Sequence, residues 1–348
     1  MSSDQDRIEA ARTLLRKHLT IDGHNDAIVA HVRHHNSSLA GRRGAARRHS
    51  GTISFAWEHE NLQPTGSLQL DLPRMREVGL DMGFFAIDVT PAFPNNLAYA
   101  LDGVGYFLND VDGCSNVQVI RCVTDLYAAR ERGAVGVLLA IEHADATARS
   151  LNVLRALYEL GVRSIGLTHN VSSWAADGCL QAREGVGLTT FGVSLVQEMN
   201  RLGMIVDLAH VSPGAFAHAI EVSSRPVIFS HGNARALRDH PRNLSDDQLR
   251  ALARNGGVIG LSLVRYFIDD EDKASVERWV DHAVHVTEVA GIETVALGSD
   301  FDGGGTLLND VTELPRLVDA LACRGYTEDE LLAILGGNWL RVLKATIG

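Results

Sequence analysis

The sequence predicts an α/β fold, specifically a TIM-like (β/α)8 barrel, on two observations. Eight short apolar runs bounded by turn residues predict buried strands, and amphipathic stretches that open on Ser, Thr or Asp and close on Gly lie between them. Strands that alternate with helices pair in parallel, and eight such units close into a barrel. The predicted strands cover residues 20–26, 82–89, 135–142, 162–169, 203–210, 225–231, 256–263 and 294–300.

An open doubly wound sheet is the competing arrangement of alternating strands and helices. It would need a glycine-rich phosphate-binding turn after the first strand. The stretch IDGHNDAIVA, residues 21–30, contains no such turn, and the run Gly303 to Gly305 follows the last predicted strand, where it indicates a loop. The sequence therefore favours the closed barrel.

The segments that connect the strands complete the predicted barrel. Residues 27–70 have little periodicity, so we expect an insertion in the first βα loop, over the active face. Helical periodicity marks the stretches SLNVLRALYELG, TTFGVSLVQEMNRLG, SDDQLRALARNGG and ASVERWVDHAVHVTEVAG. Two more helices, around ELPRLVDALACRG and TEDELLAILGGNWLRVLK, are expected to pack outside the barrel. One domain, residues 1–348, accommodates all of these elements.

Composition excludes several classes of partner. The 32 basic and 43 acidic residues give a formal charge of −11, which disfavours nucleic acid and anionic membranes and leaves a small molecule as the expected partner. The four cysteines are widely spaced and form no CxxC pair. Neither an apolar leader nor a run of about 18 apolar residues occurs, so we expect a cytoplasmic protein. A homodimer through an exposed barrel flank stays open.

Six of the eight predicted strands end in a residue type that binds metals or transfers protons. These residues are His24 and Asp26, Glu142, His169, His210, His231 and Asp300. The carboxyl ends of all barrel strands meet at one mouth, so residues far apart in the sequence would share one pocket there. Buried imidazoles and carboxylates without a cation would be costly. The pattern therefore predicts a metal site.

The ligand types indicate which metal. Imidazoles and carboxylates without thiolates suit zinc, manganese or iron better than calcium or magnesium. Two ions are plausible, with the HxD pair on one, His210 and His231 on the other, Glu142 bridging both, and Asp300 left for proton transfer. None of the three lysines lies at a strand end, and there is no GxSxG motif or strand-end cysteine, so metal-bound hydroxide is the expected nucleophile.

The motifs, taken in order, resemble those of a known family. DGHND, AIEHAD, GLTHN, DLAH, SHGNARALRDHPRN and GSDFDG, from about residue 20 to the C-terminus, are similar to the motifs of the membrane (renal) dipeptidase family of the amidohydrolase superfamily. Substrate loops match less well. Ala27 and Ile28 follow DGHND, and Tyr266 is offset from the substrate tyrosine of animal members.

The resemblance implies a role for each matching residue. It implies two zinc ions, one held by His24, Asp26 and Glu142 and the other by Glu142, His210 and His231. It implies that Asp300 takes a proton from the bridging hydroxide and passes it to the leaving amine. His169 would polarise the scissile carbonyl and stabilise the oxyanion. Arg242 would bind the free C-terminal carboxylate of the substrate.

We therefore expect a zinc-dependent dipeptidase that cleaves short substrates, including dipeptides with a C-terminal D-residue. A second hypothesis keeps the same site but assigns another small substrate, such as an N-acyl amino acid, a cyclic amide or a dipeptide made in a biosynthetic pathway. A third, from a different class, is a catalytically silent barrel that binds a ligand. It predicts missing metal ligands, whereas every ligand of the family pattern is present.

Overall fold

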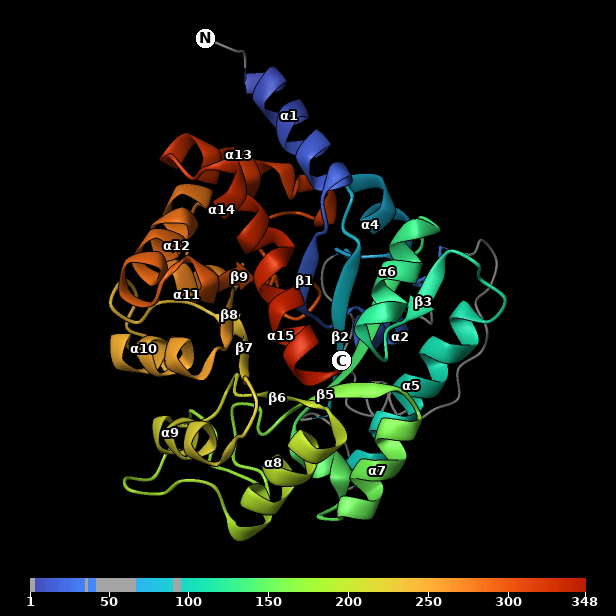
Figure 1. Cartoon of the computed structure of the whole chain (residues 1–348), viewed down its shortest axis with the longest axis vertical. Helices are drawn as coiled ribbons and strands as arrows, with labels where there is room; N and C mark the ends of the chain where they lie inside the picture. Colours follow the sequence, from blue (N-terminus) through green and yellow to red (C-terminus); the bar gives the residue numbers. More distant parts are fainter. Residues whose placement is uncertain (1–3, 35–36, 42–66, 90–94) are drawn as a thin grey trace.

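The predicted barrel is confirmed (Figure 1). The computed structural model describes residues 4–34, 37–41, 67–89 and 95–348. Eight parallel strands follow one another around the sheet in the order β1-β2-β4-β5-β6-β7-β8-β9. They are β1 Ile21–Asn25, β2 Met82–Asp88, β4 Val135–Glu142, β5 Val162–Gly166, β6 Ile205–Asp207, β7 Ile228–Gly232, β8 Val258–Leu261 and β9 Val295–Leu297. The additional strand β3, Val117–Val119, pairs with β4; its three residues are too few for the apolar pattern to predict.

The first and last strands are joined by hydrogen bonds near their carboxyl ends. The backbone N–H of Asp300 donates to the carbonyl of His24 at 3.0 Å. The buried Asp22 carboxylate accepts from the backbone N–H and the hydroxyl of Ser299, at 2.7 and 2.8 Å. These contacts close the barrel and hold the predicted site residues His24 and Asp300 next to each other.

Helices surround the strands (Figure 1), and hydroxyl caps explain where the four predicted helices begin. The side chains of Ser150, Thr189, Ser245 and Ser275 each accept a hydrogen bond from a backbone N–H in the first turn. The helices are α1 Asp4–Lys17, α2 Ala27–Arg33, α4 Leu72–Val78, α5 Asn96–Val111, α6 Val123–Glu131, α7 Leu151–Glu159, α8 Thr190–Leu202, α9 Pro213–Val222, α10 Asp246–Asn255, α11 Arg265–Ile268, α12 Val276–Ala290, α13 Pro315–Arg324, α14 Glu328–Leu332 and α15 Asn338–Thr346. Within the described ranges, none of them combines the length and apolar character that crossing a membrane requires.

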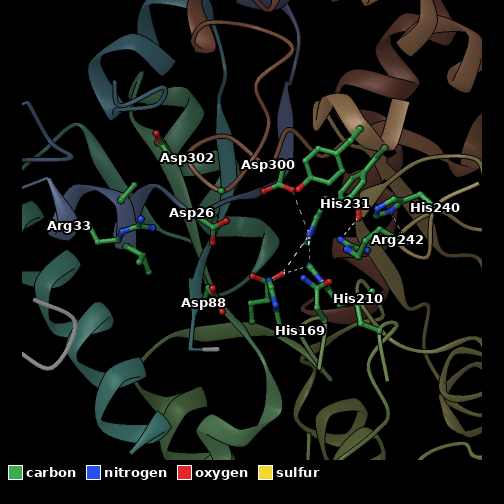
Figure 2. A pocket seen from close by; sticks show the side chains of 18 residues that line it. Asp26, Arg33, Asp88, His169, His210, His231, His240, Arg242, Asp300 and Asp302 are labelled. Atoms are coloured by element: carbon green, nitrogen blue, oxygen red, sulfur yellow. Dashed lines mark hydrogen bonds and ion pairs between the residues drawn. The ribbon is translucent and has the colours of Figure 1, made fainter. Parts of the chain in front are cut away.

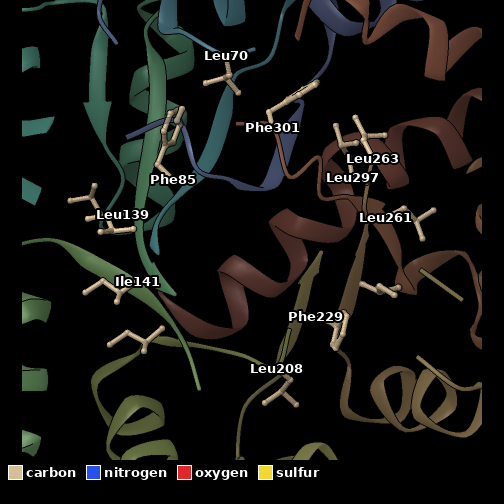
Figure 3. Close-up of a cluster of buried hydrophobic side chains, with 14 of the residues drawn as sticks. Leu70, Phe85, Leu139, Ile141, Leu208, Phe229, Leu261, Leu263, Leu297 and Phe301 are labelled. Atoms are coloured by element: carbon tan, nitrogen blue, oxygen red, sulfur yellow. The ribbon is translucent and has the colours of Figure 1, made fainter. Parts of the chain in front are cut away.

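Two clusters of buried apolar side chains fix the strands in place. The larger cluster includes Phe85, Ile141 and Phe229, together with side chains of the surrounding helices (Figure 3). The smaller one gathers neighbouring positions of the same strands, such as Phe84 and Leu138. Because side chains alternate along a strand, both faces of the strands are covered by apolar groups, as their near-continuous apolar sequences suggest.

The C-terminal helical region packs closely against the strands of the barrel. TEDELLAILGGNWLRVLK forms α14, a π-helical turn at Ala333–Gly337 and α15. Trp339 of α15 joins the smaller cluster, its ring centroid lies 5.2 Å from that of Phe84, and its indole N–H donates to the carbonyl of Leu297 at 2.9 Å. A Cβ atom at Gly23 would lie 2.0 Å from this indole ring, so the glycine of DGHND is needed for packing. Hence α15 packs against the strands themselves.

The first loop and several strand ends also differ from the prediction. Residues 27–33 form α2, and its positions 27–32 are all buried, so it has no polar face to give an amphipathic pattern. Of the predicted 27–70 insertion, residues 35–36 and 42–66 lie outside the described residues. Strands β5, β6 and β9 end at Gly166, Asp207 and Leu297. His169, His210 and Asp300 therefore each stand three residues beyond a strand.

Candidate active site

The carboxyl ends of the strands bring the predicted site residues together at one cavity of about 560 Å³ (Figure 2). Seven of the eight predicted site residues line the cavity, namely Asp26, Glu142, His169, His210, His231, Arg242 and Asp300. The eighth, His24, is 3% exposed, and its Nε2 lies 3.6 Å from Asp26 Oδ2. No predicted site residue lies away from this group.

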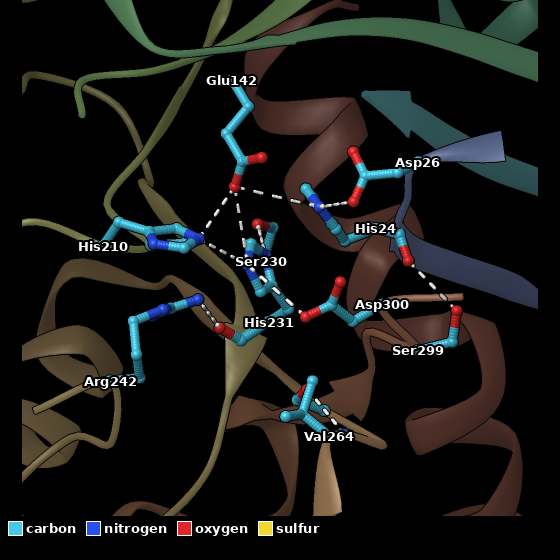
Figure 4. A network of polar contacts seen from close by, with 12 residues as sticks. His24, Asp26, Glu142, His210, Ser230, His231, Arg242, Val264, Ser299 and Asp300 are labelled. Atoms are coloured by element: carbon cyan, nitrogen blue, oxygen red, sulfur yellow. Dashed lines mark hydrogen bonds and ion pairs between the residues drawn. The ribbon is translucent and has the colours of Figure 1, made fainter. Parts of the chain in front are cut away.

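Glu142 lies at the centre of the cluster (Figure 4). Its Oε1 is 2.9 Å from Nε2 of His210, 3.6 Å from Nε2 of His231 and 3.9 Å from Nε2 of His24. Two ligand atoms that each lie about 2.0–2.1 Å from one tetrahedral ion are about 3.4 Å apart. The three observed separations lie on both sides of that value, so the side chains can converge on a shared metal.

Several atoms of the cluster are buried and have no hydrogen-bond partner. They are Nε2 of His24, Oδ1 of Asp26, Oε1 of Glu142 and Nδ1 of His169. A buried polar atom without a partner costs about 1–3 kcal/mol, and a carboxylate costs more. Donor atoms of His24, Asp26, Glu142, His169, His210, His231 and Asp300 form overlapping groups of three, each within 4.8 Å. A bound cation would satisfy the unpartnered atoms.

Neighbouring polar groups orient the two histidines beyond Glu142. The amide oxygen of Asn170 lies 2.9 Å from Nδ1 of His210, and the hydroxyl of Ser230 lies 2.9 Å from Nδ1 of His231. An amide oxygen can only accept, so Nδ1 of His210 carries the hydrogen and Nε2 keeps its lone pair. That tautomer is the one a metal ligand needs. The sequence did not single out either partner, because neither forms a pattern on its own.

Burial and mutual charge set the protonation of the metal-free cluster. Burial raises the pKa of Glu142 and raises that of Asp300 to about 7, and the charge of Asp26 adds to both effects. Burial opposes protonation of His24, but the charges of Glu142, Asp26 and Asp300 outweigh it and raise its pKa to about 10. Protons thus stabilise the buried carboxylates of the metal-free cluster, and a bound cation would take their place.

Unusual backbone geometry aims the side chains at the cavity. His210 and Asp300 have φ angles of 68° and 61°, in the left-handed region that costs a non-glycine residue about 1 kcal/mol or more. Gly303, in the loop that follows, permits the close approach of two carboxylates. A Cβ atom there would lie 2.0 Å from Oδ2 of Asp26 and 2.4 Å from Oδ1 of Asp300. The loop indicated by the glycines is thus also part of the site.

Arg242 lies beside the cluster with unused hydrogen-bonding capacity. It is 2% exposed, and its Nη2 donates to the carbonyl of His231 at 3.0 Å. Its guanidinium lies over the rings of Phe229 and Phe267, 5.7 and 5.2 Å from their centroids. Both Nε and Nη1 are buried without a hydrogen-bond partner. A buried cation with free donors at a cavity wall suits a carboxylate ligand.

The cavity wall also contains residues that the sequence did not assign to the site. Asp88 ends β2 and lines the cavity, as does Arg33 at the end of α2. Asp88 has the same signature as the predicted ligands, a polar residue that ends an apolar run, but the predicted strand extended one residue past it. Tyr266 lines the cavity with half of its surface exposed, and its ring packs against those of His240 and Phe267.

Comparisons with known proteins agree with this architecture. The family model of membrane dipeptidases (peptidase family M19) matches residues 8–347. An uncharacterized dipeptidase of Schizosaccharomyces pombe is 37% identical over 298 residues, which cover 79% of this chain and 72% of that protein.

Two solved structures are similar over nearly their whole length. Dipeptidase AC, a metallopeptidase of family M19, has a TM-score of 0.80 at 29% identity and covers 95% of this chain and 99% of its own. A metallopeptidase from Rhodobacter sphaeroides, bound to a phosphinate mimic of the dipeptide L-Ala-D-Ala, has a TM-score of 0.79 at 28% identity and covers 94% and 99%. The resemblance found in the motifs is thereby confirmed: the chain belongs to the membrane dipeptidase family, peptidase family M19, and is a hydrolase.

Proposed function

We propose that this chain is a dipeptidase that hydrolyses the peptide bond of dipeptides with the help of two zinc ions. The observation that carries the proposal is the convergence of three imidazoles and two carboxylates, with unpartnered buried atoms, in one cavity with a buried arginine. Imidazole and carboxylate ligands without thiolate suit zinc. The similarity to proteins named as dipeptidases supports the reaction class.

The five proposed ligands divide between the two ions through Glu142. His24 and Asp26 would hold one ion, His210 and His231 the other, and the Glu142 carboxylate both. Its central position, within 3.9 Å of all three histidine nitrogens, supports this bridging role. When bound, the ions supply an activated water and a Lewis acid for the substrate carbonyl.

Three further side chains are proposed to act on the substrate. Asp300 takes a proton from the attacking water and returns it to the leaving amine. Burial lowers the pKa of His169, so its imidazole is neutral and one ring N–H can donate to the carbonyl oxygen as negative charge develops there. Arg242 binds the C-terminal carboxylate of the substrate through its guanidinium group, whose Nη1 has no protein partner.

The substrate class is proposed to include dipeptides with a C-terminal D-residue. The Rhodobacter sphaeroides metallopeptidase, which is similar over nearly its whole length, holds a phosphinate mimic of L-Ala-D-Ala. The cavity of this chain, about 560 Å³, is of the size that small-molecule sites have in proteins.

Metal content and peptide hydrolysis test the proposal together. We expect about two zinc ions per chain in elemental analysis, and cleavage of L,L or L,D dipeptides that is lost on chelation and restored by added zinc. If the protein contains metal but cleaves none of the dipeptides, the result would support the second hypothesis, in which the site acts on another small amide. Protein that neither contains nor takes up metal would contradict both hypotheses.

A C-terminally amidated dipeptide tests the role of Arg242. Because the unpartnered Nη1 of its guanidinium would face an uncharged amide, we expect kcat/KM to fall by about 10- to 100-fold relative to the free acid. The Arg242→Lys variant serves as the matched change in the protein, since lysine keeps the charge but not the planar donor pair. Equal rates for acid and amide in the wild type would show that the carboxylate is not recognised.

A further inference from the structure

The wall of the active-site cavity contains an exposed leucine, Leu180, in the loop between β5 and α8. Leu180 is 62% exposed, whereas Val29, Ala30 and Phe267 in the same wall are at most 7% exposed. A single exposed leucine is ordinary on a protein surface. Its place in a barrel loop over the active face makes it a candidate for contact with a substrate.

The backbone around Leu180 is anchored next to the predicted metal ligands. The N–H of Leu180 donates to the carbonyl of Asn170 at 3.0 Å, and the N–H of Cys179 donates to the carbonyl of His210 at 2.7 Å. A Cβ atom at Gly178 would lie 2.5 Å from the carbonyl oxygen of Asn170, so the two parts of the loop pack closely. The loop therefore holds the apolar side chain in the cavity wall before a substrate binds.

Side-chain contacts on both sides of Leu180 add to this anchoring. The carboxylate of Asp177 accepts from Nε and Nη2 of Arg183, at 2.9 and 2.6 Å, and from the hydroxyl of Ser172 at 3.2 Å. The amide oxygen of Gln181 accepts the N–H of Ser172 at 2.7 Å. None of these contacts uses the side chain of Leu180, so its replacement should leave the loop in place.

Leu180 lies on the same side of the cavity as Arg242. Figure 2 shows His210 and Arg242 on one side of the cavity and Asp26 on the other. Asn170 connects Leu180 to this side, because its amide oxygen lies 2.9 Å from Nδ1 of His210 while its carbonyl accepts the N–H of Leu180. The exposed leucine thus neighbours the proposed binding position of the substrate carboxylate.

We propose that Leu180 contacts the side chain of the substrate's C-terminal residue and favours apolar side chains there, an inference that rests on the proposed dipeptidase function. The Cα of that residue is bonded to the carboxylate carbon and lies about 2.4 Å from the scissile carbonyl carbon. With the carboxylate at Arg242 and the carbonyl at the metal ligands, this Cα lies on the side of the cavity where Leu180 stands. An apolar side chain on it would cover Leu180 and remove apolar surface of both groups from water.

The Leu180→Ala variant of the zinc-loaded full chain tests this role. The measured quantity is the kcat/KM for L-Ala-Leu, with the leucine enantiomer that the wild type cleaves faster, divided by the kcat/KM for L-Ala-Gly. We expect the wild type to prefer leucine. In Leu180→Ala the ratio should fall by about 4- to 16-fold, since each buried methyl group contributes about fourfold.

Leu101→Ala is the matched control. Leu101 lies on α5, is 40% exposed and is not among the described residues that line the cavity. This variant should keep the leucine-to-glycine ratio of the wild type. Thermal unfolding and elemental analysis of the same samples monitor folding and metal content.

Two further comparisons locate the contact. L-Leu-D-Ala and Gly-D-Ala differ only at the N-terminal residue, so the ratio of their kcat/KM values should be the same in the wild type and in Leu180→Ala. Leu180→Lys should raise kcat/KM for L-Ala-D-Asp relative to L-Ala-Gly, because its ammonium group attracts the added carboxylate. A general loss of folding or metal would not improve the cleavage of one substrate over another.

An unchanged leucine-to-glycine ratio in folded, metal-loaded Leu180→Ala would overturn the proposed contact, as would a wild type without a preference for leucine. A change only in the ratio for the N-terminal residue would also overturn it. A wild type that cleaves no dipeptide would refute the proposed function instead. Calorimetry with phosphinate mimics that carry leucine or glycine at the C-terminal position, on the wild type and Leu180→Ala, would then decide the role of Leu180.

Discussion

The Asp300→Asn variant is expected to retain its metal and to lose about 10²- to 10⁴-fold in kcat, the usual contribution of a positioned proton-transfer group. Asparagine has the shape of aspartate but cannot take up or return the proton. Asp300 is 7% exposed, its Oδ2 lies 3.9 Å from Nε2 of His231, and burial raises its pKa to about 7 in the metal-free protein. The measurement is steady-state kinetics on a dipeptide, with elemental analysis of the same sample.

Asp302→Asn is a suitable control, because this carboxylate lines the same cavity but accepts backbone N–H groups. It should lose far less of kcat. Near-normal turnover of metal-loaded Asp300→Asn would exclude the proton-transfer role and leave Asp300 as a metal-site carboxylate of another kind.

The stability of the metal-free protein gives an independent measurement on Asp300. Its pKa is about 7 in the folded chain and about 3.9 when unfolded, so the folded state binds more protons between these values. The free energy of unfolding therefore falls as pH rises from about 4 to 7. Asp300→Asn removes this dependence, so the metal-free variant should be more stable than the metal-free wild type above pH 7 in thermal unfolding.

Much of the site could be predicted because, in a barrel, the position of a residue at the end of a strand determines where it lies in the structure. His24, Glu142 and His231 follow or end apolar runs, and parallel strands in a closed barrel deliver such residues to one mouth. No knowledge of side-chain contacts was needed for that step. The same rule would have found Asp88, had the strand boundary been placed one residue earlier.

The residues that were missed act through contacts that have no periodic signature. Asn170 and Ser230 orient two histidines, and Gly303 leaves room for two carboxylates. Each role depends on a contact that the folded structure brings about. Helix α2 was missed for a related reason, because burial of its positions 27–32 leaves no polar face by which a sequence reveals a surface helix.

The Glu142→Gln variant is expected to lose at least one metal ion per chain, and with it at least 10³-fold in turnover. Oε1 of Glu142 lies within 3.9 Å of three histidine nitrogens. The neutral amide of glutamine carries no negative charge to balance the two ions. Its NH₂ group donates hydrogen bonds and has no lone pair for a metal, so only one oxygen is left as a ligand. Elemental analysis and dipeptide hydrolysis measure the two effects. Glu159→Gln, on the exposed end of α7, is the matched control and should behave as the wild type.

Thermal unfolding distinguishes loss of metal binding from loss of the fold in this variant. A ligand that binds only the folded state stabilises it, so zinc added to metal-free wild type should raise Tm, whereas the same addition should have little effect on Glu142→Gln. Burial raises the pKa of Glu142, so its ionised form destabilises the metal-free fold at neutral pH. Without metal, the variant should thus be at least as stable as the wild type at pH 8. A variant that retains two ions and its response to zinc would show that the carboxylate does not bridge them, and the metal pair would have to be held by the remaining ligands.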